Sequence, residues 1–308
     1  MRDFWIDTDT ASDDAVAILM ALRWPDVNVL GISVVSGNVP VEQGEKNARY
    51  TVELCGKHTP VYKGASKPLM REPLWAYYFH GEDGMGNMQY PEPNLPLAEG
   101  HGVDALIRAV RAHPGKLTLV TLGPFTNIAL AVSMAPDIVE KIDVCYSMAG
   151  AAATLGNRTP AAEYNVIVDA ESAKIVFDSG MPVLMVGWEH CRDEGNLNPS
   201  EIDKVLSFKT PYGDFIVECN RFSVNVNQQK FHGPGMSLPD PVTMAIALDP
   251  QVCTKRSAHF VDVETKSDIT YGMTVVDQLG VLKKEPNIEV CWQIDYQRWK
   301  EVLYQTLK

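Results

Sequence analysis

Four aspartates lie within eight consecutive positions, where a short apolar run gives way to a helical pattern. Asp7 and Asp9 follow the apolar run 4–6, while Asp13 and Asp14 precede apolar residues at helical spacing. The pattern predicts a strand followed by a helix, with the acids at the carboxyl end of the strand, where open α/β sheets bind their ligands. Carboxylates this close repel one another unless a positive charge lies among them. The segment therefore favours an α/β fold with a cation site.

An ordinary helix start explains only half of this cluster. Acids in the first turn of a helix are stabilised by its macrodipole, by roughly 0.3–1 kcal/mol each, and this suffices for Asp13 and Asp14. It does not explain Asp7 and Asp9 beside them. A hard cation held by oxygen ligands does, and such ligands suit calcium or magnesium better than zinc. Ser12 is expected to cap the helix.

Length and composition limit the class of protein. The 308 residues are 45% hydrophobic and show no break in composition, which predicts one domain over residues 1–308. A formal net charge of −12 argues against nucleic acid or an anionic membrane as a partner. No apolar stretch is long enough to span a bilayer, and the first residues do not resemble a secretory leader. Six scattered cysteines without a CxxC pair favour reduced thiols, so a cytoplasmic protein is expected.

Strand-like and helical runs alternate along most of the chain. This alternation predicts βαβ units and an open, mainly parallel, Rossmann-like sheet with helices on both faces, spanning about the first two thirds of the sequence. The segment 75–96, rich in Gly, Pro and aromatic residues, is expected to form a long loop near a pocket. The expected strands are 4–6, 27–35, 117–122, 142–149 and 183–186, and the expected helices after the first are 41–55, 125–135, 171–178, 210–226 and 299–307.

Spacing tests the simpler explanations of the acidic cluster. An EF-hand loop starting at Asp7 would need Gly and Glu where the chain has Ser12 and Ile18, so it fails. A phosphatase of the haloacid dehalogenase type begins with DxDx[TV], and here both acids match but the last position is Ala11. That phosphatase stays an alternative, with Asp7 as its nucleophile. No phosphate-cradling glycine motif occurs.

The four acids together resemble the DxDxxxDD signature of the nucleoside hydrolases, the inosine-uridine preferring family of N-ribohydrolases. The next most distinctive similarity is the N-x5-E-x-N pattern formed by Asn157, Glu163 and Asn165, which resembles the ribose-binding stretch of that family. Their order and spacing along nearly the whole chain make the resemblance specific. The other similar stretches are 34–38, 122–129, 239–241 and 272–277.

The resemblance implies an enzyme that hydrolyses the N-glycosidic bond of ribonucleosides, giving ribose and a free base, with Ca²⁺ as its cofactor. Asp13 matches the position of the general base of the family. The resemblance also implies a homo-oligomer, either a dimer or a tetramer. It also assigns two groups of binding residues. The implied Ca²⁺ ligands are Asp9, Asp14, Asp240 and the carbonyl of Leu122, with Asp7 supporting this cluster instead of binding the ion. The implied substrate-binding residues are Asn38, His80, Asn157, Glu163 and Asn165.

One position departs from the family pattern. Many members have a His before the last metal-binding Asp, where it is associated with protonating the leaving base, but this chain has Pro239. Proline has no proton to give, so activation of the leaving base must come from elsewhere. A second alternative is therefore a non-catalytic protein that binds ribose or nucleosides. The candidates for activating the base are the polar groups His80, His232, Glu189 and His190 and the aromatic residues Trp75, Tyr77, Tyr78 and Trp188.

Overall fold

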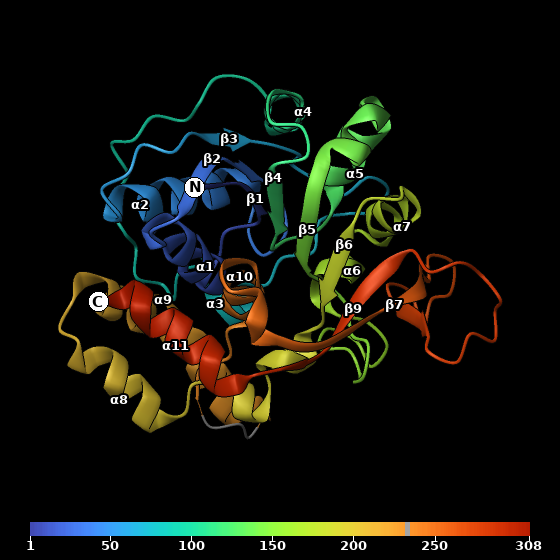
Figure 1. Ribbon diagram of the computed structural model, residues 1–308. Helices are drawn as coiled ribbons and strands as arrows, with labels where there is room; N and C mark the ends of the chain where they lie inside the picture. Colours follow the sequence, from blue (N-terminus) through green and yellow to red (C-terminus); the bar gives the residue numbers. More distant parts are fainter. Residues whose placement is uncertain (232–234) are drawn as a thin grey trace.

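The computed structural model describes residues 1–231 and 235–308, with the side chains of residues 230 and 231 also left undescribed (Figure 1). His232, one of the candidates above, lies outside the described residues. The core of the fold is a nine-stranded sheet in the order β3-β2-β1-β4-β5-β6-β9-β7-β8. The strands are β1 (Arg2–Thr8), β2 (Val27–Val34), β3 (Val61–Lys63), β4 (Leu117–Thr121), β5 (Ile142–Met148), β6 (Val183–Val186), β7 (Cys253–Val263), β8 (Thr274–Asp277) and β9 (Ile288–Ile294).

The expected open and mainly parallel sheet is confirmed, but its expected extent is wrong. Neighbouring strands from β3 to β9 run parallel, whereas β7 pairs antiparallel with both β9 and β8. The last third of the chain therefore adds three strands to the sheet. These strands come together by long-range pairing, which local periodicity does not reveal.

Helices cover both faces of the sheet, as expected. One face packs against α1, α2, α9, α10 and α11, and the other against α4, α5 and α7 (Figure 1). Each inner strand is apolar on both sides: Phe4 and Ile6 of β1 face the first group of helices, and Trp5 faces the second. This explains the unbroken apolar runs of the parallel strands. The helices named here are α1 (Ser12–Arg23), α2 (Val41–Leu54), α4 (Gly102–Ala112), α5 (Thr126–Met134), α7 (Ala170–Asp178), α9 (Pro211–Val226), α10 (Pro239–Leu248) and α11 (Tyr296–Leu307).

The order of the strands reverses direction at β1. From this strand the chain builds β2 and β3 on one side and later β4, β5 and β6 on the other. The carboxyl ends of β1 and β4 therefore lie side by side at a topological switch point, where open α/β sheets form a ligand crevice. The acidic segment 7–14 starts at the end of β1 and continues into α1. The fold thus places it at this crevice.

The start of α1 differs from the expectation for Ser12. The residue before the helix is Ala11, whose backbone N–H donates to the Asp14 carboxylate at 2.9 Å. An acid in the first turn thus satisfies a free N–H of the helix start, as a capping side chain would. The Ser12 hydroxyl instead lies 2.9 Å from Nδ1 of His80, which ends α3 (Tyr77–His80) inside the long loop 75–96. The expected cap residue is therefore used to hold that loop.

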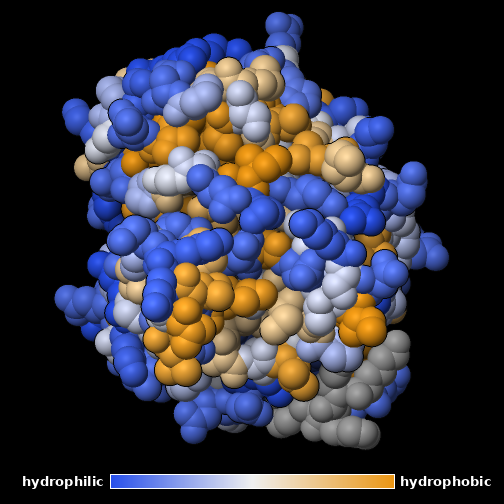
Figure 2. Space-filling model, turned by 90° about the vertical axis from the view of Figure 1, so that its right-hand side faces the viewer, coloured by the Kyte–Doolittle hydropathy of each residue, from blue (hydrophilic) through white to orange (hydrophobic). Residues whose placement is uncertain are grey.

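The surface shows where apolar side chains meet solvent. Several of the most exposed large apolar residues lie around β8, in the segment 269–282. Figure 2 views the molecule from the side that carries this region and shows hydrophobic patches separated by hydrophilic residues. In the part of the chain that the structure describes, no helix has the length and hydropathy needed to cross a membrane.

Two methionines test the packing of α1 against the sheet. Met20 is fully buried in α1, whereas Met134, at the end of α5, is 64% exposed. We expect Met20→Ala to lower the free energy of unfolding by about 2–5 kcal/mol, because it removes packed atoms and leaves a cavity. Met134→Ala should change it by less than about 0.5 kcal/mol. Urea unfolding followed by circular dichroism measures both, and equal losses would contradict this description of the core.

Candidate active site

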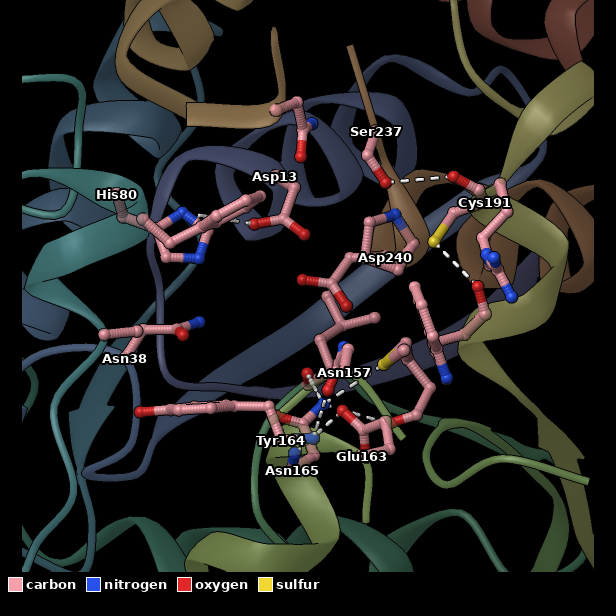
Figure 3. A pocket seen from close by; sticks show the side chains of 18 of the residues that line it. Asp13, Asn38, His80, Asn157, Glu163, Tyr164, Asn165, Cys191, Ser237 and Asp240 are labelled. Carbon is pink, nitrogen blue, oxygen red and sulfur yellow. Dashed lines mark hydrogen bonds and ion pairs between the residues drawn. The ribbon is translucent and has the colours of Figure 1, made fainter. Parts of the chain in front are cut away.

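A cavity of about 280 Å³ opens at the carboxyl ends of the central strands. Figure 3 shows acids at its centre, with polar and aromatic side chains around them. This volume is close to the lower end of the usual range for small-molecule sites. The lining is partly apolar and includes a few convergent polar groups, as is typical of such sites. Of the predicted site residues, those that line it are Asp13, Asn38, His80, Leu122, Asn157, Glu163, Asn165 and Asp240.

Three buried carboxylates converge at one side of this cavity. Oxygen atoms of Asp13, Asp14 and Asp240 lie within 4.8 Å of one another. Asp14 is tied into the fold, because it accepts hydrogen bonds from the Thr8 hydroxyl at 2.5 Å and from the Ala11 N–H. Asp240 lies in the first turn of α10, where the helix macrodipole favours a negative charge. Residues far apart in the sequence are thus brought to one point.

Asp9 lies next to these three carboxylates and is enclosed by backbone. Its Oδ2 accepts the Asn38 N–H at 2.6 Å, while its Oδ1 is buried without a hydrogen-bond partner among the described residues. A Cβ atom at Gly37 would lie 2.1 Å from Oδ2, and one at Gly123 would lie 2.7 Å from Oδ1. The loops after β2 and β4 can approach Asp9 this closely only because both positions are glycine.

Burial and mutual repulsion disfavour the charged forms of these acids. Burial, followed by the charge of Asp14, raises the pKa of Asp13 to about 8. The same two causes, in the same order, raise the pKa of Asp9 and of Asp240 well above the usual range. Among the described residues, no lysine or arginine forms an ion pair with any of them.

The donor set fits a hard metal ion. All the groups are oxygens, and both Asp9 Oδ1 and Asp13 Oδ1 are buried without a hydrogen bond in the described part of the chain. A bound cation would offset the repulsion that raises these pKa values and would give the unpartnered oxygen of Asp9 a partner. Oxygen-only ligation is typical of calcium and magnesium sites. The residues present are therefore suited to such an ion.

Asp7 has a different place from the other acids. It is fully buried and does not line the cavity; its carboxylate accepts hydrogen bonds from the Ser33 hydroxyl and from the Asn127 amide, the latter at 2.8 Å. The same Asn127 side chain accepts the Ala65 N–H at 2.8 Å. Asp7 thus joins β1 to neighbouring segments beneath the site. This position does not suit the nucleophile of a phosphatase, which must reach its substrate.

Residues of the N-x5-E-x-N stretch form the opposite wall of the cavity. Glu163 accepts backbone N–H groups of Gly150, Asn165 and Val166, and its burial raises the pKa to about 7. The Asn165 amide donates to the Leu122 carbonyl at 2.7 Å. These bonds fix the side chains before any ligand arrives. A carbonyl oxygen has two lone pairs, so that of Leu122 retains one for a further partner.

The other two amides of the predicted set lie on different sides of the cavity. The Asn157 Oδ1 accepts the Tyr164 N–H at 2.9 Å, and the residue itself is exposed. The Asn38 amide is 3.4 Å from Asp14, which places it between the carboxylates and the cavity. Amide groups in these positions offer donors and acceptors to a polyhydroxylated ligand.

His80 is the imidazole that lines the cavity beside Asp13. Its Nδ1 lies 2.9 Å from the Ser12 hydroxyl and 3.8 Å from Asp13 Oδ1, while Nε2 has no hydrogen-bond partner among the described residues. Burial lowers the pKa of His80 to about 3, so the ring is neutral near pH 7. If the Ser12 hydroxyl donates to Nδ1, the ring proton is on Nε2. Pro239 also lines the cavity and carries no such group.

The other candidates for activating a leaving group divide into two sets. Tyr78 and Trp188 line the cavity, but Trp75 and Tyr77 do not. The Glu189–His190 pair also lies outside the cavity wall: Glu189 accepts the Ala152 and Ala153 N–H groups, and Nε2 of His190 lies 2.9 Å from the Cys291 carbonyl.

Apart from Trp188, the residues of one wall of the cavity were not predicted from the sequence. The wall is formed by residues around the short helix η2 (Trp188–Cys191) and by residues just before α10. They share no spacing or residue type that would have indicated a pocket. Tyr164 was also missed; its hydroxyl donates to the carbonyls of Gly37 and Leu74. The missed lining residues include Met148, Tyr164, Cys191, Arg192, Asp193, Asn196, Asn227 and Ser237.

Comparisons with known proteins show the family of the chain. The family model described as inosine-uridine preferring nucleoside hydrolase matches residues 4–301. The pyrimidine-specific ribonucleoside hydrolase RihA of Salmonella enteritidis is 35% identical over 305 residues, which cover 98% of this chain and 97% of that protein.

Solved structures give the same result. The plant nucleoside hydrolase PpNRh1 has a TM-score of 0.93 at 28% identity, and a purine-preferring ribonucleoside hydrolase from Gardnerella vaginalis has 0.91 at 28% identity. Each alignment covers 99% of this chain and 98% of the other chain. Fold and site thus define an enzyme that acts on N-glycosidic bonds. The chain belongs to the inosine-uridine preferring nucleoside hydrolase family.

Proposed function

We propose that this protein is a Ca²⁺-dependent ribonucleoside hydrolase that releases ribose and a free purine or pyrimidine base. The observation that carries this proposal is the group of three buried carboxylates within 4.8 Å, beside a cavity whose other wall holds prearranged amide and carboxylate groups. The carboxylates suit a hard cation, and the opposite wall suits the hydroxyls of a sugar. The cavity of about 280 Å³ that both groups line has room for one small ligand.

In this proposal the carboxylates divide into ligands and a base. Asp9, Asp14, Asp240 and the Leu122 carbonyl hold the ion. When bound, calcium supplies positive charge that orients the ribose hydroxyls and makes a water molecule more acidic. Asp13 is left as the general base, because its Oδ1 has no hydrogen-bond partner among the described residues and its side chain reaches the cavity.

The ribose is held by groups on both sides of the cavity. Asn38, next to Asp14, and the trio Asn157, Glu163 and Asn165 on the far wall bind its hydroxyls. Existing hydrogen bonds to the backbone fix the side chains of the trio, so little conformational entropy is lost when the sugar binds. Such prearrangement favours the flattened, positively charged ribose of an oxocarbenium-like transition state.

The leaving base needs a hydrogen-bond donor, because Pro239 cannot provide one. His80 takes this role in the proposal: the Ser12 hydroxyl occupies Nδ1 and leaves Nε2–H available to the substrate. A neutral imidazole can stabilise a developing negative charge by donating a hydrogen bond, without becoming charged itself. Trp188 lines the same cavity and offers an aromatic face to the departing base.

The other hypotheses differ in what they leave unexplained. A binding protein without activity would need the sugar site but not Asp13 and His80 at its edge, so turnover decides between the two. The phosphatase is disfavoured because Asp7 does not reach the cavity.

Relatives are named as pyrimidine-specific or as purine-preferring, and for this chain we therefore propose no single base. The expected homo-oligomer and cytoplasmic location stay predictions.

Removing calcium should abolish hydrolysis. We expect release of free base from a panel of inosine, adenosine, guanosine, uridine and cytidine to stop with a calcium chelator and to return when Ca²⁺ is added.

Calcium at 100 times its dissociation constant should also stabilise the fold by about 2.7 kcal/mol, measured as an increase in melting temperature. Asp240→Asn should lose this increase. Asp104→Asn, an exposed acid in the first turn of α4, is the matched control that keeps it. Activity that persists without bound metal would overturn the proposed cofactor.

Replacing the proposed base should slow chemistry without removing the metal. Asp13→Asn is expected to lower kcat by about 10²–10⁴-fold, because the attacking water loses its proton acceptor. Asp193→Asn, at another acid that lines the cavity, serves as the control and should retain activity. Steady-state kinetics gives kcat, and the calcium-dependent melting temperature confirms that the variant is folded. Near wild-type turnover by Asp13→Asn would show that another group is the base.

A change of leaving group tests His80. We expect His80→Ala to lower kcat for nucleosides by about 10²-fold or more, but to affect 4-nitrophenyl riboside little, because nitrophenolate leaves without a proton. Ser12→Ala should also lower kcat for nucleosides more than for 4-nitrophenyl riboside, but by a smaller factor. Ser12→Thr, which keeps the hydroxyl, should retain nucleoside turnover. Equal losses on both substrates would mean that His80 only supports the fold of the loop.

A further inference from the structure

Two cysteines from neighbouring strands meet outside the active-site cavity. All six cysteines are free, and five of them are buried; Cys253 is only partly buried. The Cys291 thiol lies 3.2 Å from the sulfur of Cys253 and donates a hydrogen bond to it. Cys253 begins β7 and Cys291 lies within β9, two strands that lie side by side in Figure 1. The proposed hydrolysis uses neither thiol.

An irregularity in the strand pairing produces this contact. In the antiparallel register Cys253 lies opposite Ile294, whereas Cys291 lies opposite Arg256, so the two cysteines are not a directly opposed pair. The register shifts on both sides of Lys255. Such a bulge re-aims the side chains around it. It brings the two sulfur atoms to 3.2 Å, about 1.2 Å more than the length of a disulfide bond, a gap that a small movement of the two residues and their strands can close.

The two thiols differ in reactivity. The hydrogen bond from Cys291, and the charge of Arg256, lower the pKa of Cys253, which is also the more exposed of the pair. Hydrogen bonding to Cys253 and burial raise the pKa of Cys291. The thiolate is the reactive form of cysteine. An accessible thiol of lowered pKa beside a buried second thiol is the arrangement of an attacking and a resolving cysteine.

We propose that Cys253 and Cys291 form a reversible disulfide, with a low-molecular-weight disulfide as the oxidant. The Cys253 thiolate attacks one sulfur of the oxidant, forming a mixed disulfide and releasing one thiolate. The Cys291 thiol then loses its proton to water and its sulfur attacks Sγ of Cys253, releasing the second thiolate. One oxidant molecule is reduced to two thiols and one protein dithiol is oxidised. Excess thiol reverses both steps.

The bond would act on a segment that holds the active-site cavity. The carbonyl of Cys291 lies 2.9 Å from Nε2 of His190, which belongs to η2. Trp188 and Cys191 at the two ends of η2 line the cavity, and Figure 3 shows Cys191 at its wall. Closing the gap between the two sulfurs shifts β9 at the residue that anchors η2. We therefore expect the disulfide to alter nucleoside binding, an effect that rests on the proposed function.

Mass spectrometry tests the disulfide independently of any activity. The native protein is treated with glutathione disulfide, free thiols are alkylated after unfolding, and peptides are mapped. We expect two fewer alkylated thiols than in the untreated protein, a peptide joining Cys253 to Cys291, and full reversal by dithiothreitol. Cys291→Ser should stop at one glutathione on Cys253, and Cys253→Ser should remain unmodified. Both thiols remaining fully alkylatable, or a bond to another cysteine, would overturn the proposal.

A kinetic comparison tests the link to the cavity. The KM for the preferred nucleoside should differ at least twofold between the oxidised and reduced wild-type protein, and the oxidant should leave the KM of Cys253→Ser unchanged. If the disulfide is mapped but KM stays the same, the coupling through His190 is wrong while the disulfide remains. If no nucleoside is hydrolysed at all, the proposed function fails, and the mass measurement still decides the disulfide.

Discussion

The repulsion among buried carboxylates is the constraint on which this structure depends. Four buried carboxylates make up the cluster, and few hydrogen-bond donors are near them. They are those of Asp9, Asp13, Asp14 and Asp240. The fold gives some of them partners, from Thr8 and from the backbone of Ala11 and Asn38. Two oxygens still have none among the described residues. Such a cluster costs folding free energy in the absence of a cation, so its presence is better explained by binding than by stability.

The sheet topology turns this cluster into one wall of a cavity. Because the strand order reverses at β1, the loops after β1, β2 and β4 meet at the same edge, and two glycines let the backbone close around Asp9. The stretch 157–165 follows β5 and supplies the facing wall. The sheet therefore fixes how the carboxylate wall and the facing wall are placed relative to each other. The walls that would contact a base come from α3, η2 and the start of α10, and these can vary without disturbing the sheet.

Local signals predicted the parts of the protein that are local. Acids beside a strand end, and Asn and Glu residues at fixed spacing, indicated both walls before the fold was known. Three features depend on distant pairing and left no periodic signal. β9 joins the sheet beside β6, the Ser12 hydroxyl contacts His80 instead of capping α1, and residues around Trp188 close the cavity. The position of Asp7 beneath the site also depends on a distant partner, Asn127, so only the family resemblance, and no local signal, implied it.

Pro239 bears on both the carboxylate cluster and the activation of a leaving base. Proline is well suited to the first position of a helix, because it needs no hydrogen-bond acceptor there, and it starts α10 directly before Asp240. The end of α10 that carries Asp240 thus starts with a residue of fixed φ, which has no side-chain proton donor. The only imidazole that lines the described cavity wall belongs to α3, and the Ser12 hydroxyl fixes its orientation from the first turn of α1. In the proposed enzyme, activation of the leaving base therefore moves from the ion-binding helix to the loop over the cavity.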